Sequence, residues 1–337
     1  MSIYAQSIYY VSPHALSGGD GSLAAPFHLI HEAVEKARKD KNCTTIYLRE
    51  GKYILDKPLV LTSDDGNDLK ELVIKNYPGE KAIISSGIIL DLKWEKYRNG
   101  MMRATVKGNP VMDMLIVNGD LKSMARYPDY DKNAVRFNGT SALATAPERV
   151  KKWKHPEGGY LHAMHSHDWG DFHYRITGKN EKGELQLEGG WQNNRPMGIH
   201  NENRMVENIF EELDVPGEWY YNKEEGRLYY YPLPDEKINE LTFETPQLKN
   251  LIEFAGTLSA PVKNITIEGI ELTQTIRTFM EHYEPLLRSD WTIYRGGTVI
   301  FRGTEKCALR DCYIHNVGGN GVFFDKYNRY SAVTGSY

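Results

Sequence analysis

Cysteine is scarce in this chain. Among its 337 residues there are only three cysteines, Cys43, Cys307 and Cys312, and an odd number leaves at least one thiol unpaired. Cys307 and Cys312 lie five residues apart in a strand-like stretch, and a regular strand would point them to opposite faces. We therefore expect no disulfide framework, and we interpret these two residues as small buried hydrophobic side chains.

Long apolar runs and an excess of one charge are also missing. No stretch approaches the roughly 18 consecutive apolar residues of a membrane-spanning helix. The 41 Lys and Arg against 45 Asp and Glu give a net charge of −4, which is too balanced for binding nucleic acid or an anionic membrane surface. The P-loop, GxGxxG, GxSxG and CxxC patterns do not occur, so nucleotide binding and Ser-His-Asp chemistry have no support. We expect no nucleic-acid partner, no membrane span and no cofactor.

Tyrosine and tryptophan, in contrast, are plentiful, with 22 Tyr and 6 Trp. An aromatic face covers the apolar C–H groups of a sugar ring, while a phenol hydrogen-bonds its hydroxyls. Tyrosine also fills β-sheets, so the composition is compatible with sugar binding and equally with a sheet-rich core.

Short strands dominate the pattern of the first hundred residues. One amphipathic helix is predicted over His28–Lys39, where apolar residues recur at helical spacing. The predicted strands are mostly closed by Gly, Pro or Asp turns; they are Ile8–Val11, Thr44–Leu48, Pro58–Leu61, Leu72–Tyr77 and Ala82–Ile84. Short strands at this spacing, almost without helix, favour a β-sandwich or a solenoid.

A repeat near the end of the chain decides between these two folds. Asn264–Thr273 can be laid on Lys306–His315 with matching apolar positions, and Ser331–Tyr337 begins the pattern again. Without the extra stretch Ile276–Gly297, the intervals are roughly 20 to 24 residues, the length of one coil of three strands. A single coil cannot bury its own apolar side, so coils must stack. The sequence predicts an all-β, right-handed parallel β-helix with an N-terminal capping helix.

The segment from about 130 to 245 breaks this rhythm. It holds four of the six tryptophans and a predicted aromatic hairpin that turns at Lys223–Gly226. We therefore divide the chain into an N-terminal cap with the first coils (1–128), an inserted β-rich domain (129–245) and further coils (246–337). The third repeat is cut off at Tyr337 without a cap, and we expect the natural protein to continue.

The first residues are similar to the end of a trimmed signal peptide. Tyr4-Ala-Gln6 has the small-residue character of a cleavage site, although the charged and apolar regions are missing. The alternative is an ordinary N-terminal strand. We expect an exported protein, secreted or periplasmic.

Several longer motifs carry a family resemblance. Gly19-Asp-Gly-Ser22 and Ile46–Tyr53 resemble the cap and first coil of pectate-lyase-like β-helix proteins. More specific motifs resemble glycoside hydrolase family 141; they are Val117-Asn-Gly119, Ala125–Pro128, Gly189–Pro196, Val206–Tyr220 and Leu228–Pro232. The resemblance covers nearly the whole chain and implies a β-helix with a β-rich insertion, and α-L-fucosidase or xylanase activity on plant cell-wall polysaccharide. Family members are considerably longer, and the resemblance places their catalytic acids on later coils, so this chain is expected to resemble a truncated member.

Candidate catalytic residues follow from the chemistry of glycosides. Hydrolysis usually needs two carboxyl groups that flank the scissile oxygen, and on a β-helix these would project from neighbouring coils, about 5 Å apart per step. Asp325 at a strand end and Asp311 at a bend are the candidate acids, and His315 is a candidate proton shuttle or sugar ligand. The alternatives are a surface ion pair, a turn carboxylate and a turn histidine, respectively.

Candidate substrate-binding residues lie mainly in the stretch that interrupts the repeat. Long loops that leave a rigid scaffold commonly contact ligands, and this loop carries His282, Tyr283, Trp291 and Tyr294. We predict an aromatic wall for a sugar there, with self-packing of the loop as the alternative. Arg126 would be able to clamp a uronate carboxylate, with a structural ion pair as the alternative.

A cluster of histidines raises the question of a metal. His162 and the pair His165 and His167 would point to opposite faces of a strand, so we predict no metal site. The expected partner is a polysaccharide or oligosaccharide substrate, bound by a monomer. Two rivals to a glycoside hydrolase stay open. One is a polysaccharide lyase, which needs a uronate and Ca²⁺-binding carboxylates, and the other is a non-catalytic glycan-binding fragment.

Overall fold

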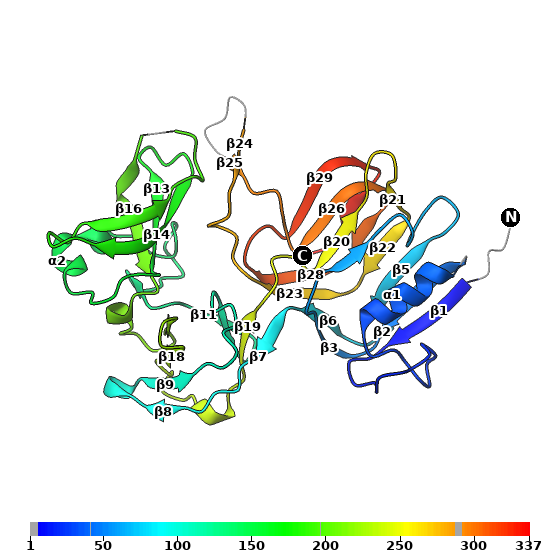
Figure 1. Cartoon of the computed structure of the whole chain (residues 1–337), viewed down its shortest axis with the longest axis horizontal. Helices are drawn as coiled ribbons and strands as arrows, with labels where there is room; N and C mark the ends of the chain where they lie inside the picture. Colours follow the sequence, from blue (N-terminus) through cyan, green and yellow to red (C-terminus); the bar gives the residue numbers. More distant parts are fainter. Residues whose placement is uncertain (1–5, 41, 196, 287–291) are drawn as a thin grey trace. The chain divides into compact units, whose positions relative to one another are not determined.

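The computed structural model describes residues 6–40, 42–195, 197–286 and 292–337, which fall into two compact units (Figure 1). Unit 1 comprises Met1–Ile88, Pro246–Ile276 and Gly296–Tyr337, and unit 2 comprises Ile89–Thr245 and Arg277–Arg295. The chain first enters unit 2 through β7 (Gly87–Ile89) and returns through β19 (Phe243–Pro246). Within the described ranges, no helix has the length and apolar character needed to cross a membrane.

Unit 1 consists of three parallel sheets. The first contains β1 (Gln6–Val11), β2 (Cys43–Leu48), β5 (Leu72–Asn76), β22 (Ile265–Glu268), β27 (Ala308–Arg310) and β30 (Ala332–Thr334). The second contains β3 (Gly51–Ile54), β6 (Ala82–Ser85), β23 (Glu271–Thr275) and β28 (Tyr313–Val317). The third contains β4 (Leu59–Leu61), β20 (Ile252–Ala255), β21 (Val262–Lys263), β26 (Val299–Glu305) and β29 (Val322–Arg329).

Consecutive strands visit the three sheets in turn. The chain passes from β22 to β23 and β26, and then repeats the circuit through β27, β28 and β29 before β30 rejoins the first sheet. Ile267 pairs with Leu309, and Leu309 pairs with Val333, all in parallel. The predicted repeat and the all-β fold class are therefore confirmed, whereas the handedness of the coil stays a prediction.

A corner between the first and second sheets explains how both late cysteines reach the core. Gly269 and Asp311 occupy the same place one coil apart, and their φ angles are 67° and 51°. This left-handed conformation turns the chain sharply, so Cys307 and Cys312 both point inward and are 1% and 2% exposed. The regular strand assumed from the sequence was wrong here, but the prediction of buried cysteines is confirmed. Burial raises the pKa of both thiols to about 11.

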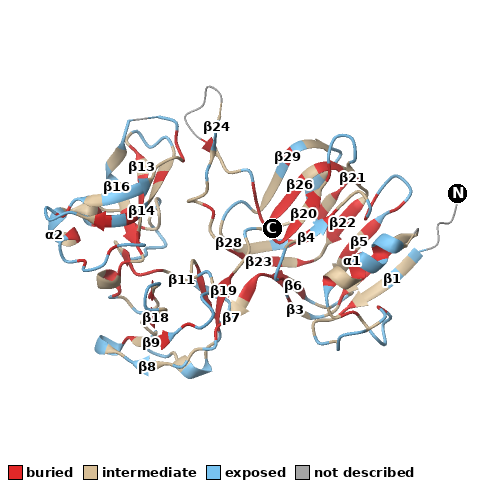
Figure 2. Cartoon of the chain, viewed as in Figure 1, coloured by how far each residue is buried: buried red, intermediate tan, exposed pale blue. Residues whose placement is uncertain are grey.

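The core of unit 1 is filled by apolar side chains from all three sheets (Figure 2). Phe254 and Phe301 stack with ring centroids 4.4 Å apart on neighbouring strands of the third sheet. The helix α1 (Ile30–Lys39) buries its apolar face against this core. It begins later than predicted because the carboxylate of Glu32 accepts hydrogen bonds from the backbone N–H groups of His28 and Leu29, which holds these two residues outside the helix.

Unit 2 contains three antiparallel groups of strands. The largest sheet has the order β12 (Arg126–Tyr127), β16 (Ile199–Glu207), β13 (Tyr160–His165), β14 (Asp171–Lys179) and β15 (Leu185–Gly189). A second has the order β17 (Trp219–Asn222), β18 (Arg227–Tyr230), β9 (Met102–Thr105) and β8 (Glu95–Lys96), and β10 (Leu115–Val117) pairs with β11 (Asp120–Lys122) and β19. The smaller elements are α2 (Pro147–Val150), β24 (Glu284–Pro285), β25 (Thr292–Ile293) and four short 3₁₀ turns, at Arg98–Gly100, Ala142–Thr145, Phe210–Glu212 and Ile238–Glu240.

The boundaries of unit 2 differ from those of the predicted insertion 129–245. The predicted hairpin is confirmed, with Trp219 paired to Tyr230. Unit 2 nevertheless begins at Ile89, because β9 pairs with β18 and β10 pairs with β19. It also includes the later segment from Arg277, which is tied to it where the Trp191 indole N–H donates to the backbone oxygen of Glu281.

Candidate functional site

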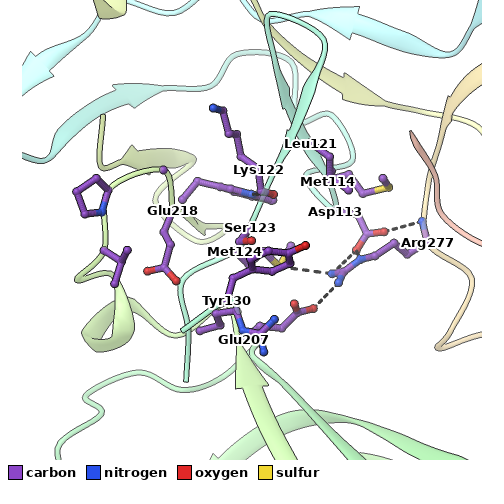
Figure 3. Close-up of a pocket in the computed structure, with 15 residues that line it drawn as sticks. Asp113, Met114, Leu121, Lys122, Ser123, Met124, Tyr130, Glu207, Glu218 and Arg277 are labelled. Carbon is purple, nitrogen blue, oxygen red and sulfur yellow. Dashed lines mark hydrogen bonds and ion pairs between the residues drawn. The ribbon is translucent and has the colours of Figure 1, made fainter. Parts of the chain in front are cut away.

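A cavity of about 590 Å³ lies within unit 2 (Figure 3). This size is within the range of small-ligand sites in proteins. Its lining is drawn from all three groups of strands, namely from β11, from β12 and β16, and from β17 with the segment before it. The acidic and basic residues of the lining are Asp113, Lys122, Arg126, Glu207, Glu218 and Arg277.

Arg277 binds two carboxylates at one side of the cavity. Its backbone N–H donates to Asp113 Oδ2 at 2.7 Å and its Nε donates to Asp113 Oδ1 at 2.9 Å, while its Nη1 donates to Glu207 Oε1. The three side chains are only 18%, 16% and 11% exposed. Burial alone would lower the pKa of Arg277, but the charges of Glu207 and Asp113 outweigh burial and raise it. The result is a buried ion-pair network in which the guanidinium is fixed by two partners.

Glu207 is held as a carboxylate by this network. Burial alone would raise its pKa, but the positive charge of Arg277 and the hydrogen bond from His162 hold the pKa well below the usual range. His162 Nε2 lies 3.2 Å from Glu207 Oε1. Arg277 and His162 both contact the same oxygen of Glu207, so this carboxylate is ionised and already holds two charged or polar partners.

Glu218 has the opposite environment. It is 3% exposed, and neither carboxyl oxygen makes a hydrogen bond of normal geometry. Figure 3 shows it on the opposite side of the view from Arg277, with its carboxyl group directed toward the interior. Burial raises the pKa of Glu218 to about 8, and the negative charges of Asp214 and Asp129 add to this effect. At neutral pH it is therefore mainly an uncharged acid with an O–H to donate.

The raised pKa of Glu218 predicts a pH-dependent stability. Unfolding would return this carboxyl to its ordinary pKa of 4.5, so the folded state binds the proton more tightly. This contribution is fully present below about pH 4.5 and is lost as the pH rises through about 8. We expect the free energy of unfolding of Glu218→Gln to exceed that of the wild type increasingly over this interval, as measured by urea denaturation at several pH values. If the free energies of unfolding of the two proteins changed in parallel with pH, the raised pKa of Glu218 would be contradicted.

Glu207 and Glu218 together give the cavity two carboxyl groups in different protonation states. One cavity holds an uncharged carboxylic acid at Glu218 and an ionised carboxylate at Glu207. Groups whose environments push their pKa values apart are the usual basis for acid and base roles at a single site. The arrangement can donate a proton from one wall and stabilise a developing positive charge at the other.

The three predicted catalytic residues lie elsewhere, in unit 1. Asp325 is 3% exposed and accepts a hydrogen bond from Arg302 Nε at 2.9 Å, so a buried acid pairs with an arginine whose side chain is 33% exposed. Asp311 occupies the exposed corner described above. His315 Nε2 lies 2.8 Å from Glu271 Oε1. Asp325 belongs to the third sheet and His315 to the second, so the structure does not bring the three into one constellation, and their catalytic role stays a prediction.

The described part of the predicted sugar-binding loop packs on itself and on the rest of unit 2. The ring of His282 lies 4.9 Å from that of Trp191, and the ring of Tyr283 lies 5.9 Å from that of Tyr294. Burial raises the pKa of Tyr283 to about 12. Trp291 lies outside the described residues. An aromatic wall for a sugar therefore stays a prediction, and the observed contacts are those of the alternative, self-packing.

Arg126 lines the cavity but is occupied by the backbone. It is 5% exposed, and it donates to the carbonyl oxygens of Pro128, Phe137 and Gly139. Burial lowers its pKa. These hydrogen bonds fix the loop that follows β12, so the guanidinium holds that loop in place.

Sequence reasoning did not single out Glu207, Glu218 or Arg277. A signal was present for the two acids, because Glu207 and Glu218 both lie inside Val206–Tyr220, the motif that carried much of the family resemblance. Nothing distinguished Arg277, whose partners are far away in the sequence. Across the part of the chain that the structure describes, no three His, Cys, Asp or Glu side chains are grouped so as to hold a metal ion.

Comparison with known proteins gives a structural likeness without a sequence match. No protein-family model matches the chain, and no curated protein matches it in sequence. It is similar to a solved structure titled "Glycoside hydrolase", with a TM-score of 0.75 and 20% identity over 94% of this chain and 63% of that one. Two further structures share less. They are "The complex structure of XylC with xylose" (TM-score 0.46, 13% identity, 94% of this chain and 41% of that one) and a GH136 lacto-N-biosidase from Eubacterium ramulus (0.31, 11%, 98% and 34%).

The first of these likenesses shows the fold. The chain has a glycoside hydrolase-like fold, and it spans about 63% of the length of that similar structure.

Proposed function

We propose that this chain is a secreted carbohydrate-active protein of the glycoside hydrolase type, built on a right-handed parallel β-helix like that of family 141. In this proposal the cavity of unit 2 binds a sugar unit of a plant cell-wall polysaccharide. The observation that carries the proposal is the pairing, in one cavity, of an uncharged Glu218 with an ionised Glu207. The likeness in fold to a glycoside hydrolase supports it.

Glu218 is the proton donor in this mechanism. As the glycosidic C–O bond breaks, the leaving oxygen takes the proton of Glu218. A water molecule then adds its oxygen to the anomeric carbon and returns a proton to Glu218, which restores the acid. The acid is suited to this role because it is mainly protonated at neutral pH and is not held by an ion pair.

Glu207 acts differently, as a fixed negative charge. Its Oε1 is already bound by Arg277 and His162, which makes it a weak base. The transition state of glycoside hydrolysis has the character of an oxocarbenium ion, and a preorganised carboxylate stabilises such positive charge. We therefore assign Glu207 to electrostatic stabilisation.

The rival lyase would need a group that neutralises a uronate carboxylate. The candidate for that task was Arg126, but its guanidinium donates to three backbone carbonyls. The other rival is a protein that binds a glycan without catalysis.

An assay of the whole chain separates these possibilities. We expect incubation with xylan and with fucosylated pectic oligosaccharides to release new reducing ends from one of them, without any rise in near-ultraviolet absorbance. A rise in that absorbance would reveal the unsaturated product of a lyase. Binding by calorimetry with no new reducing ends would favour the glycan-binding protein and contradict the hydrolase.

A further inference from the structure

Two histidines form a buried pair behind Glu207. His162 on β13 and His173 on β14 are direct neighbours across the sheet, and their Nδ1 atoms are 2.7 Å apart. The side chains are only 8% and 12% exposed. The outer nitrogen of each ring contacts a carboxylate, so that His162 Nε2 lies 3.2 Å from Glu207 and His173 Nε2 lies 3.4 Å from Asp171.

Counting donors and acceptors fixes the protons of this pair. An ionised carboxylate only accepts hydrogen bonds, so the Nε2 atom of His162 carries the N–H that Glu207 accepts. The side chain of Asp171 is 43% exposed and is therefore open to solvent. Two facing Nδ1 atoms at 2.7 Å also need a proton between them, because two N–H groups would clash and two lone pairs would repel. Two neutral imidazoles carry two ring N–H protons in total, and this arrangement uses both. With Nε2 of His162 protonated, its Nδ1 is the acceptor of the N–H on Nδ1 of His173.

The surrounding charges are consistent with this count. Burial alone would raise the pKa of Asp171, but the interaction with His173 outweighs burial and lowers it. Burial lowers the pKa of His162, and the negative charge of Glu207 opposes this only in part. Burial thus favours the neutral form of His162, in which one ring nitrogen donates to Glu207 and the other accepts from His173.

We propose that His162 and His173 share one proton between their Nδ1 atoms, and that together they are positioning residues which hold Glu207 ionised and oriented toward the cavity. The inference deepens the proposed function and rests on it only for its catalytic consequence. The pair works through Glu207 and has no contact with a sugar in this mechanism.

The shared proton limits the pH range in which the pair persists. A further proton would place N–H groups on both Nδ1 atoms and break the 2.7 Å contact, and loss of the shared proton would leave two nitrogen lone pairs facing each other. The groups that face the pair from the neighbouring elements include Asp171 on β14, Glu207 on β16, Tyr160 on β13 and Arg277. Phe137 and Phe279 cover its rings. Of these neighbours, Arg277 and the two carboxylates carry charge near neutral pH.

Nuclear magnetic resonance of the whole chain with ¹⁵N-labelled histidine tests the proposal without any substrate. The wild type should show one strongly deshielded proton coupled to the Nδ1 nitrogens of both rings, with Nε2 of His162 protonated. His173→Phe keeps a ring against Phe279 and should lose this signal. His173→Gln should lose it too, while its amide N–H still donates to His162 Nδ1 and preserves the Nε2–H that binds Glu207.

Activity profiles then show what the pair does. If the chain hydrolyses a glycan, kcat of His173→Phe should fall with little change in KM and its pH profile should shift, and His173→Gln should recover part of the loss. The absence of the shared-proton signal in a folded wild type would overturn the inference whatever the activity. Its presence in an inactive chain would leave the inference standing and count only against the proposed function. The amide spectrum of each variant checks folding, and the Gln variant serves if the Phe variant does not fold.

Discussion

Replacing Glu218 by glutamine is expected to slow glycoside hydrolysis by roughly 10²- to 10⁴-fold, the usual contribution of a general acid. Glutamine has nearly the same shape as the protonated acid, and it still offers N–H groups to a sugar, but it has no proton to transfer. Because Glu218 is already uncharged near neutral pH, the substitution leaves the charge of the cavity almost unchanged. The loss should therefore lie in kcat, with KM close to that of the wild type.

The pH profile and a surface control make this result specific. The wild-type rate should decline as the pH rises through about 8, where Glu218 loses its proton, and Glu218→Gln should lack that limb. Glu224 is an exposed residue of the same unit, and Glu224→Gln should behave as the wild type. A Glu218→Gln protein with an unchanged rate would show that the proton comes from another group.

Removing Arg277 is expected to have the largest effect on stability. Arg277→Met leaves the buried carboxylates of Asp113 and Glu207 without their main cation, and breaking one partner of a buried pair commonly costs about 3–5 kcal/mol. Methionine fills much of the same volume, so the loss arises from the uncompensated charges rather than from a cavity. Urea denaturation at pH 7, followed by the fluorescence of the tryptophans of unit 2, measures the effect.

A triple variant separates charge from packing. Adding Asp113→Asn and Glu207→Gln to Arg277→Met removes the stranded charges, so it should recover a large part of the lost stability. The single carboxylate variants, each keeping Arg277, serve as the matched controls. A loss below about 1 kcal/mol for Arg277→Met would mean that this network is effectively solvated.

The coil architecture was accessible from the sequence because its signal is local. Apolar residues recur at alternate positions within each short strand, and the pairing of Ile267 with Leu309 follows from that pattern. The sequence predicted a bend at Asp311 but not its conformation, since a left-handed φ of 51° at a residue other than glycine leaves little trace in the sequence. That single bend reverses the face to which the second cysteine points.

The candidate site was accessible only in part. Glu207 and Glu218 stand in a motif that drew attention as a family resemblance, but the motif does not reveal that one is ionised and the other is not. That difference depends on burial and on Arg277, which lies 70 residues after Glu207. The start of unit 2 at Ile89 is hidden for a similar reason, because β9 and β10 pair with strands more than a hundred residues later.

The position of Arg277 just after β23 has a consequence for how the protein is made. A ribosome delivers Asp113 and Glu207 long before it delivers Arg277, which emerges only after the coil strands β22 and β23. Domains generally fold as they are synthesised, from the N-terminal end onward. Until residue 277 has left the ribosome, a nascent unit 2 has two inward-facing acids and no guanidinium to neutralise them. Unit 2 can therefore be completed during translation only after the chain has returned to unit 1 and supplied Arg277.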